Sequence, residues 1–231
     1  MAEQKTLLAM GAHYDDCVYG IPGTMLQAVA KHYRVVQLIL IGDYSNWPPT
    51  KGREQSFLDG TIEISKSYGV ETQYLDFASQ KYDTNAETKR KVAQAVHEIK
   101  PDIAFHLWEN DHHHDHTVAS QLSKIALRHG GRILNEDGFK TPRAIYQYDN
   151  GPGHTIGFEP DTFVDVTDHW ERAHEWLGRF MALMQNQPFD ASRQSGAQRG
   201  KETLARYRGQ TCGVAYAEGL WAARKRPVDI L

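Results

Sequence analysis

The sequence predicts an α/β fold in which a mostly parallel sheet is covered by helices on both faces. Short apolar segments alternate with longer segments whose apolar residues recur at helical spacing. This alternation is typical of βαβ units, whose parallel strands pair within one sheet. No internal repeat or linker divides the 231 residues, and chains of this length commonly form one domain. We therefore expect a single domain over residues 1–231.

The predicted strands are short runs with few charged residues. The run at 34–41 (RVVQLILI) is almost wholly apolar, which indicates a strand covered on both faces. The run at 6–12 ends in a polar cluster, as a buried strand does when it reaches the edge of a sheet. The predicted strands lie at 6–12, 34–41, 72–77, 103–107, 143–148 and 162–166.

The predicted helices have recognisable ends. Gly69 follows one helix as a C-cap, Pro101 ends another, and Gly130-Gly131 is expected to stop a third. The polar segment 187–200 is the best candidate for a mobile loop, such as a lid, and the tail around Leu220 is expected to pack back on the core. The predicted helices lie at 23–33, 53–68, 85–100, 115–129 and 167–185, with one more after residue 200.

Composition and charge exclude several classes of protein. Lys+Arg 26 against Asp+Glu 29 gives a net charge of −3, whereas a protein that coats nucleic acid usually has a basic excess. No apolar run approaches the ~20 residues of a membrane span, and the start of the chain lacks the pattern of a secretion signal. Cys17 and Cys212 fit a reducing compartment. We expect a cytoplasmic protein that binds neither nucleic acid nor membrane, as a monomer or a homo-oligomer.

Two carboxylates follow the first predicted strand. The strand runs into His13, Tyr14, Asp15 and Asp16, where a nucleotide-binding fold would place a glycine-rich turn for phosphate. Two carboxylates repel phosphate and attract a cation. Because adjacent side chains point in different directions, one can hold a metal while the other reaches a water molecule. The alternative is that Asp15 or Asp16 only caps the next helix.

A histidine-rich segment follows the strand predicted at 103–107. Of the twelve histidines in the chain, four lie in residues 112–116, with Asp111 and Asp115 around them. Neutral imidazole and carboxylate are good ligands for zinc and similar divalent ions. The alternative is a surface loop in which Asp115 acts only as a helix cap.

The two clusters are more informative together. The carboxyl ends of parallel strands meet at one edge of a sheet, which is where ligands bind in such folds. His13, Asp16 and one histidine of the second cluster therefore supply three protein ligands and leave a position for water, the pattern of a catalytic zinc site. A structural zinc site is more often closed by cysteines, and the sequence has no Cys-x-x-Cys pair.

These residues resemble the LmbE-like or PIG-L family, the N-acetylglucosaminyl deacetylases. That family carries Ala-His-Pro-Asp-Asp after its first strand and His-x-Asp-His later, which match residues 12–16 (AHYDD) and 113–116 (HHDH). The segments 52–54 (GRE) and 217–219 (AEG) are weaker matches near the middle and the end of the chain. Tyr14 departs from the family's proline.

The resemblance implies a Rossmann-like three-layer α/β/α sandwich and a role for each matching residue. It implies zinc, or another divalent ion among iron, cobalt and manganese, held by His13, Asp16 and His116. It implies that Asp15 is the general base on the water that zinc activates. It also implies that His113 is an acid or oxyanion stabiliser oriented by Asp115, and that Arg53 lies near the pocket and contacts substrate or the Asp15 region. The substrate class implied is a small N-acyl amino sugar, which a hydrolase would split to an acid and an amine.

Four further side chains have weaker support as substrate contacts. The aromatic residues Trp47, Tyr44 and Trp108 follow predicted strands and would either wall a sugar site or pack at its rim. His154, in a glycine-rich segment, would either reach the site or lie in a surface loop. Two other functions stay open: a phosphoesterase, which often uses two metals and more carboxylates, and a non-catalytic metal-binding module, which has no need of Asp15.

Overall fold

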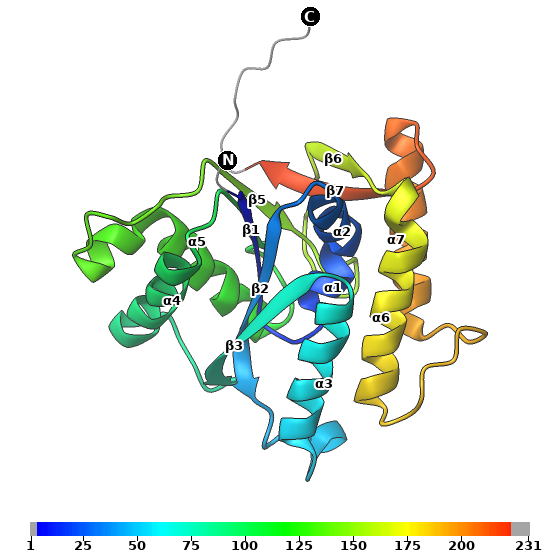
Figure 1. Cartoon of the computed structure of the whole chain (residues 1–231), viewed down its shortest axis with the longest axis horizontal. Helices are drawn as coiled ribbons and strands as arrows, with labels where there is room; N and C mark the ends of the chain where they lie inside the picture. Colours follow the sequence, from blue (N-terminus) through cyan, green and yellow to red (C-terminus); the bar gives the residue numbers. More distant parts are fainter. Residues whose placement is uncertain (1–3, 223–231) are drawn as a thin grey trace, which may run out of the picture.

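The computed structural model describes residues 4–222, which contain one seven-stranded sheet in the order β3-β2-β1-β4-β5-β7-β6 (Figure 1). The first five strands of this order pair in parallel, whereas β7 is antiparallel to both of its neighbours. The strands are β1 (Thr6–Gly11), β2 (Arg34–Asp43), β3 (Val70–Ala78), β4 (Ile103–Leu107), β5 (Ala144–Tyr148), β6 (Thr162–Asp165) and β7 (Ala217–Ala222).

Helices cover both faces of the sheet, so the predicted three-layer α/β fold is confirmed. On one face α4 packs against α5, and on the other α6 packs against α2, α3 and α7 (Figure 1). The helices are α1 (Asp16–Gly20), α2 (Pro22–Ala30), α3 (Glu54–Ser67), α4 (Ala86–Ile99), α5 (His114–Leu134), α6 (Trp170–Met184) and α7 (Gly196–Cys212), with short 3-10 turns at η1 (Pro48–Thr50) and η2 (Thr167–His169).

The strand β1 lies in the middle of the sheet and is buried along its whole length. It pairs with β2 on one side and β4 on the other, so that Leu7 lies between Val35 and Ile103. A strand that is covered on both faces has to be apolar throughout. After Thr6 at its start, the next polar residue is His13, which follows the strand and so lies at the carboxyl edge of the sheet.

The end of α5 differs from the expected one. The helix continues through Gly130 and Gly131 to Leu134, and Asn135 then takes the left-handed conformation, with φ 55°. The two glycines serve packing instead: a Cβ atom on Gly130 would lie 2.3 Å from the ring of Phe139. The expected glycine stop was therefore wrong, because tertiary contact selects glycine here.

The C-terminal part is more regular than the sequence indicated. The segment expected to be a loop over 187–200 ends at Ser195, whose side chain accepts a hydrogen bond from Gln198 N and caps α7. The tail around Leu220 is strand β7, inserted between β5 and β6. It was missed because its sequence, AEGLWA, does not alternate polar and apolar residues.

Glu218, in the weakly matching segment 217–219, holds the start of α2. Its buried carboxylate accepts hydrogen bonds from Gly23 N at 2.9 Å and from Thr24 N at 2.8 Å. The ammonium of Lys201, also buried, lies 3.2 Å from Glu218 and donates to Gly20 O at 2.8 Å. The carboxylate thus stabilises the N-terminus of a helix that begins soon after Asp16.

His106, in β4, gives the fold an expected sensitivity to acid. It is buried, with Nδ1 3.0 Å from Leu107 O, and burial lowers the pKa of its imidazole to about 3. The unfolded value is ~6.5, so the unfolded chain binds the proton more tightly. The contribution of neutral His106 is therefore complete above pH ~6.5 and is lost as the pH falls toward the folded pKa.

We expect His106→Gln to flatten the pH dependence of stability. Between about pH 6 and pH 4 the wild-type free energy of unfolding should fall more steeply, by up to ~1.4 kcal/mol per pH unit. Urea unfolding of both proteins across this range measures the difference. Equal slopes would show that His106 titrates normally or that other groups govern acid unfolding.

Among the helices formed by residues 4–222, none combines the length and the apolar character that crossing a bilayer requires.

Candidate metal centre and active site

The predicted site residues come from two loops that leave neighbouring strands. His13, Asp15 and Asp16 follow β1, and the segment from Asp111 to His116 follows β4. These strands are adjacent in the sheet, and the chain crosses from one side of β1 to the other between them. Ligands of open α/β sheets bind at such a switch point. The structure therefore brings the two sequence clusters together.

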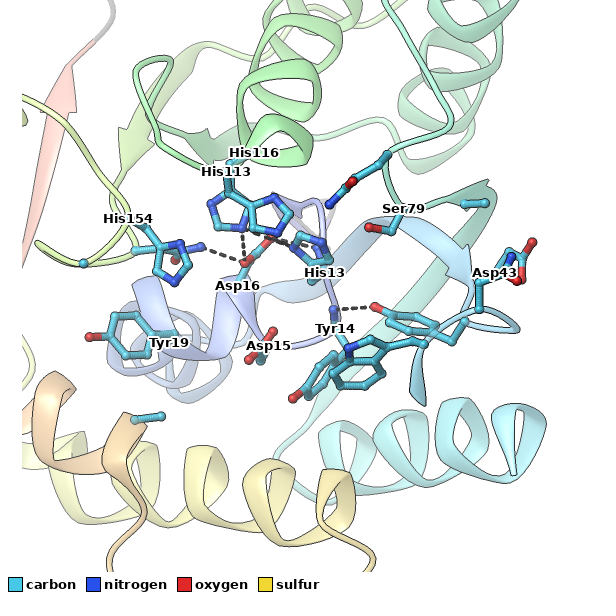
Figure 2. A pocket seen from close by; sticks show the side chains of 18 residues that line it. His13, Tyr14, Asp15, Asp16, Tyr19, Asp43, Ser79, His113, His116 and His154 are labelled. Atoms are coloured by element: carbon cyan, nitrogen blue, oxygen red, sulfur yellow. Dashed lines mark hydrogen bonds and ion pairs between the residues drawn. The ribbon is translucent and has the colours of Figure 1, made fainter. Parts of the chain in front are cut away.

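His13, Asp16 and His116 form a compact group of donor atoms (Figure 2). His13 Nδ1 lies 3.2 Å from His116 Nε2, His116 Nε2 lies 3.2 Å from Asp16 Oδ1, and His13 Nδ1 lies 3.7 Å from Asp16 Oδ2. Ligands placed tetrahedrally ~2.1 Å from one ion would lie ~3.4 Å apart. The spacing and the chemistry of these donors fit a divalent transition metal.

A carboxylate lies against the other nitrogen of each imidazole. Asp115 Oδ2 is 3.2 Å from His13 Nε2, and Asp111 Oδ2 is 3.1 Å from His116 Nδ1. The second contact is poorly aligned as a hydrogen bond and is therefore mainly electrostatic. Metal-binding histidines characteristically have such carboxylate partners, which fix the ring and raise its basicity.

Asp115 is itself held by a third loop, the one that follows β3. Its Oδ2 accepts a hydrogen bond from Ser79 Oγ at 2.6 Å, and its Oδ1 accepts one from Gln80 N at 2.8 Å. Asp115 Oδ2 lies 3.9 Å from His113 Nδ1. Its main imidazole partner is therefore His13, whereas the sequence predicted that it orients His113.

The charges around the imidazoles favour a cation. Burial alone would lower the pKa of His13, but its contacts with Asp115 and Asp16 raise it to about 9. Burial is likewise outweighed at His116, where Asp16 and Asp111 raise the pKa to about 10. Burial would raise the pKa of Asp16, yet the two histidines hold it well below its usual range. A bound divalent ion would supply the positive charge that these carboxylates attract.

Asp15 is separate from this group and is not a helix cap. It occupies the N-cap position of α1, but its side chain makes no capping hydrogen bond, and it lines the cavity beside Asp16 (Figure 2). Burial, and then the charge of Asp16, raise the pKa of Asp15 to about 6. A carboxylate with a pKa near neutrality is suited to accept and return a proton. The capping alternative is thus wrong for Asp15.

His113 faces the same space with its ring beside the imidazoles of His13 and His116. Its ring centroid lies 4.7 Å from that of His13 and 4.8 Å from that of His116. Its Nδ1 accepts a hydrogen bond from Asp115 N at 3.3 Å, so the neutral ring carries its proton on Nε2. Burial, and then the charges of His13 and His116, lower the pKa of His113. The ring is thus a neutral hydrogen-bond donor.

The site opens into a cavity of about 750 Å³. In Figure 2 the group of His13, Asp16 and His116 lies in the middle, with Tyr19 and His154 toward one end and Tyr14 and Asp43 toward the other. Aromatic rings wall the second end: the ring of Tyr14 lies 5.8 Å from that of Trp47. Among residues 4–222, those that line the cavity include no lysine or arginine.

Tyr14, at the family's proline position, contributes to the site through its backbone as well as its ring. Its N–H donates to Tyr44 Oη at 3.0 Å, a bond that proline could not make. Its ring packs edge-on to Phe57, with centroids 4.9 Å apart. The substitution therefore exchanges a fixed φ for an aromatic wall.

Three of the five predicted substrate contacts line the cavity and two do not. Trp47, Tyr44 and His154 are part of its lining. Arg53 is turned away: its guanidinium donates to Leu183 O at 3.0 Å and also to Met184 O, because the last carbonyls of α6 attract a cation. Trp108 donates to Ile156 O at 3.0 Å, which restrains the segment that carries His154. Both support the site's walls from outside the cavity.

The structure adds two residues that the sequence did not single out as ligands or partners. Asp111 lies inside the histidine-rich segment, so its proximity to the site was a signal that could have been used. Asn150, which donates to Asp16 Oδ1 at 2.7 Å, lies far away in the sequence. Its place directly after β5, at the same edge of the sheet, was the only signal of its role.

Asp111→Asn is expected to weaken zinc binding by ~10–100-fold, the usual cost of losing a carboxylate that supports a ligand. The change removes the charge opposite His116 Nδ1. In the wild-type protein His113 N donates to Asp111 Oδ1 at 2.7 Å, and the side-chain oxygen of asparagine can still accept this hydrogen bond. Competition with a chromophoric chelator measures the affinity. An unchanged affinity would mean that Asp111 only shapes the loop.

Comparisons with known proteins identify the family and the fold. The model of the family described as PIG-L, GlcNAc-PI de-N-acetylase, matches residues 8–127. The conserved protein TT1542 from Thermus thermophilus is 23% identical, with a TM-score of 0.80 and 97% of each chain covered. GalB, the 4-carboxy-2-hydroxymuconate hydratase from Pseudomonas putida, is 18% identical, with a TM-score of 0.79, and the match covers 99% of this chain and 100% of GalB.

A third similar structure is the N,N'-diacetylchitobiose deacetylase from Pyrococcus horikoshii, 18% identical, with a TM-score of 0.76 and coverage of 95% of this chain and 84% of that one. At these identities the structural likenesses establish the fold. The family match spans more than half of the 231 residues and includes His13, Asp16 and His116. The chain therefore belongs to the PIG-L family.

Proposed function

We propose that this protein is a metal-dependent hydrolase that removes an N-acetyl or other N-acyl group from an amino-sugar conjugate. The observation that carries the proposal is a carboxylate, Asp15, that lies beside a complete three-ligand group without belonging to it. Asp15 lines the cavity, caps no helix and has a pKa raised to about 6 by burial and by the charge of Asp16. A site that only binds metal has no use for such a group, whereas hydrolysis requires a base.

In this proposal His13, Asp16 and His116 hold one divalent ion, zinc in the first instance. The chemistry supplied by such an ion is Lewis-acid polarisation of a carbonyl and acidification of water. Asp15 accepts the proton of the attacking water. His113 donates its Nε2 proton as a hydrogen bond to the developing oxyanion, and it does so as a neutral imidazole. Asp15 then returns its proton to the leaving nitrogen, so that water and amide become a carboxylic acid and an amine.

The walls of the cavity favour a neutral, polyhydroxylated substrate. Aromatic faces such as that of Trp47 pack against the apolar faces of sugar rings, and the absence of lysine and arginine among the described lining residues disfavours a polyanion. This charge pattern is the reason to prefer amide hydrolysis over the hydration of a carboxylate-rich substrate or the cleavage of a phosphoester.

The test is a screen for released acetate and free amine with zinc-loaded protein over N-acetylglucosamine and its glycosides. We expect acetate and amine in equal amounts. Parallel arms should contain a phosphomonoester and a substituted muconate. Release of phosphate, or hydration of the muconate without amide cleavage, would overturn the proposal in favour of the corresponding activity.

His113→Ala is expected to lower kcat by ~10²–10³-fold, as loss of an oxyanion donor does, with metal content unchanged. His114→Ala is the matched control. It neighbours His113, but its side chain is 58% exposed and it does not line the cavity. Steady-state kinetics and metal analysis of both variants provide the measurement. Equal losses in the two variants would argue against a role for His113 in the reaction.

A further inference from the structure

The helix α7 buries two cations, Lys201 and Arg208. Lys201 pairs with Glu218 and holds the end of α1, so its contacts serve the fold around the start of α2. Arg208 donates to Asp149 Oδ1 at 2.6 Å, and both of these side chains are buried. Replacing a buried ion pair by apolar side chains of similar volume is often neutral or stabilising. The pair of Arg208 and Asp149 therefore points to a role beyond packing.

This ion pair is connected to Asp16, a proposed metal ligand. Asp149 directly precedes Asn150, and Asn150 Nδ2 donates to Asp16 Oδ1 at 2.7 Å. The series consists of four buried residues, each between 4% and 7% exposed: Arg208, Asp149, Asn150 and Asp16. Because none of them faces water, a displacement at one end of the series is passed on to its neighbour.

The two oxygens of Asp16 are held in different ways. Oδ2 accepts hydrogen bonds from Ala12 N and His13 N, both at 2.7 Å, so the loop after β1 fixes it. Oδ1 accepts the hydrogen bond from Asn150 and lies 3.2 Å from His116 Nε2. The direction in which Oδ1 faces therefore depends on Asn150 and on His116, another proposed ligand.

Arg208 anchors the chain on the N-terminal side of Asn150. On its other side, Gly151 has φ +83° and packs so closely on Tyr19 that a Cβ atom would lie 2.8 Å from the tyrosine hydroxyl. Without the guanidinium of Arg208, the carboxylate of Asp149 would be a buried charge without its cation, which is strongly unfavourable. The carboxylate would then move toward water, and the adjacent Asn150 would move with it.

We propose that Arg208 is a positioning residue for the metal centre and acts on Asp16 through Asp149 and Asn150. The proposal rests on one part of the proposed function, the assignment of Asp16 as a metal ligand. Arg208 lies in α7, beyond the residues 8–127 that match the family model, and does not line the cavity. Its removal should nevertheless change the affinity for the metal and the geometry of the ligands around it.

The experiment is a double-mutant cycle on metal binding. In a chelator competition, Asn150→Ala should weaken zinc binding by ~10–100-fold and Arg208→Met by ~10-fold, the losses usual for residues that support a ligand. If Arg208 acts through Asn150, adding Arg208→Met to Asn150→Ala should cause no further loss. The visible absorption bands of the cobalt-loaded protein report the geometry of the ligands, and they should change in Arg208→Met.

Arg206→Met is the matched control, because Arg206 lies on the same helix with a side chain that is 56% exposed and pairs with Glu202. It should bind zinc and cobalt as wild type does. Asp149→Asn keeps the shape of its side chain and replaces Arg208→Met in the cycle if the methionine variant fails to fold. Its zinc affinity should also fall, and the loss should likewise disappear in the Asn150→Ala background.

Wild-type zinc affinity in folded Arg208→Met, or losses that add in the double variant, would overturn the proposal. So would a lower urea midpoint with unchanged cobalt bands, because Arg208 would then stabilise the fold alone. Failure of the proposed hydrolysis has a different signature: zinc-loaded wild-type protein releases no acetate, while the binding cycle keeps its expected pattern. Wild-type protein that binds neither zinc nor cobalt would overturn this proposal together with the metal centre.

Discussion

Asp15→Asn should lower turnover by ~10²–10⁴-fold, the usual loss when a general base is removed. The asparagine has the same shape, but its oxygen is too weakly basic to accept a proton from water. Asp15 makes no helix cap, and the proposed metal ligands are three other residues, so stability and metal content should change little. Steady-state kinetics with metal analysis of the same samples measures both quantities.

The matched control is Asp83→Asn, since the side chain of Asp83 is 81% exposed and does not line the cavity. It removes one carboxylate from the same protein and should retain wild-type turnover. If Asp15→Asn also retains wild-type turnover, then Asp15 is not the base. If it loses its metal, then Asp15 is a ligand and the proposed division of roles is wrong.

The dependence of activity on pH should also identify Asp15 as the base. A base must be deprotonated to act, so activity should fall as the pH drops through the pKa of Asp15. Burial, and then Asp16, raise that pKa to about 6, and a bound cation lowers it again, which places the acid limb at or below pH ~6. The limb belongs to Asp15 and the attacking water jointly. In the residual activity of Asp15→Asn the limb should be shifted, because only the water then titrates.

His116→Ala should abolish both metal binding and activity. His116 is buried at the start of α5, and its Nε2 lies 3.2 Å from both His13 Nδ1 and Asp16 Oδ1. Removing a ligand should cost more affinity than the ~10–100-fold expected for a supporting carboxylate. Titration of metal-free protein with cobalt, followed by visible absorption, measures the loss.

His114→Ala is the control here as well, since it removes an imidazole from the same turn of the helix. It should bind one cobalt ion with wild-type affinity. If His116→Ala binds cobalt as tightly as wild type, the ion is held by other residues, such as the alternative group of His13, His113 and Asp115.

Much of the sheet could be predicted because the apolar runs that form its strands can be recognised without knowing which residues they pack against. The run at 34–41 is so apolar that only a strand covered on both faces accommodates it, and it is β2. The strand predicted at 103–107 has the bounds of β4. β7 was not predicted because it is stabilised by contacts with residues that are distant in the sequence. Glu218 is buried, and its carboxylate accepts a hydrogen bond from α2 and pairs with Lys201. No local sequence pattern reveals such contacts.

The proximity of His13, Asp16 and His116 could be predicted for a topological reason. His13 and Asp16 follow one strand and His116 follows another, and parallel strands bring such ends together whatever the details of the loops. This topological rule does not predict which way side chains point in the outer parts of the site. Arg53 also lies in a segment that follows a strand, β2. Its guanidinium nevertheless donates to the carbonyl groups at the end of α6, which hold it away from the cavity. Asp115 found its partner in His13 because the loop after β3 holds its carboxylate.

The most direct test of the account is a titration of metal-free protein with zinc, following acetate release from the best N-acetyl amino sugar. One ion held by His13, Asp16 and His116 predicts that activity rises linearly and reaches its plateau at one equivalent of zinc per chain. A plateau at two equivalents would indicate the two-metal chemistry of a phosphoesterase-like site. Activity that does not depend on zinc or any other divalent ion would contradict the account.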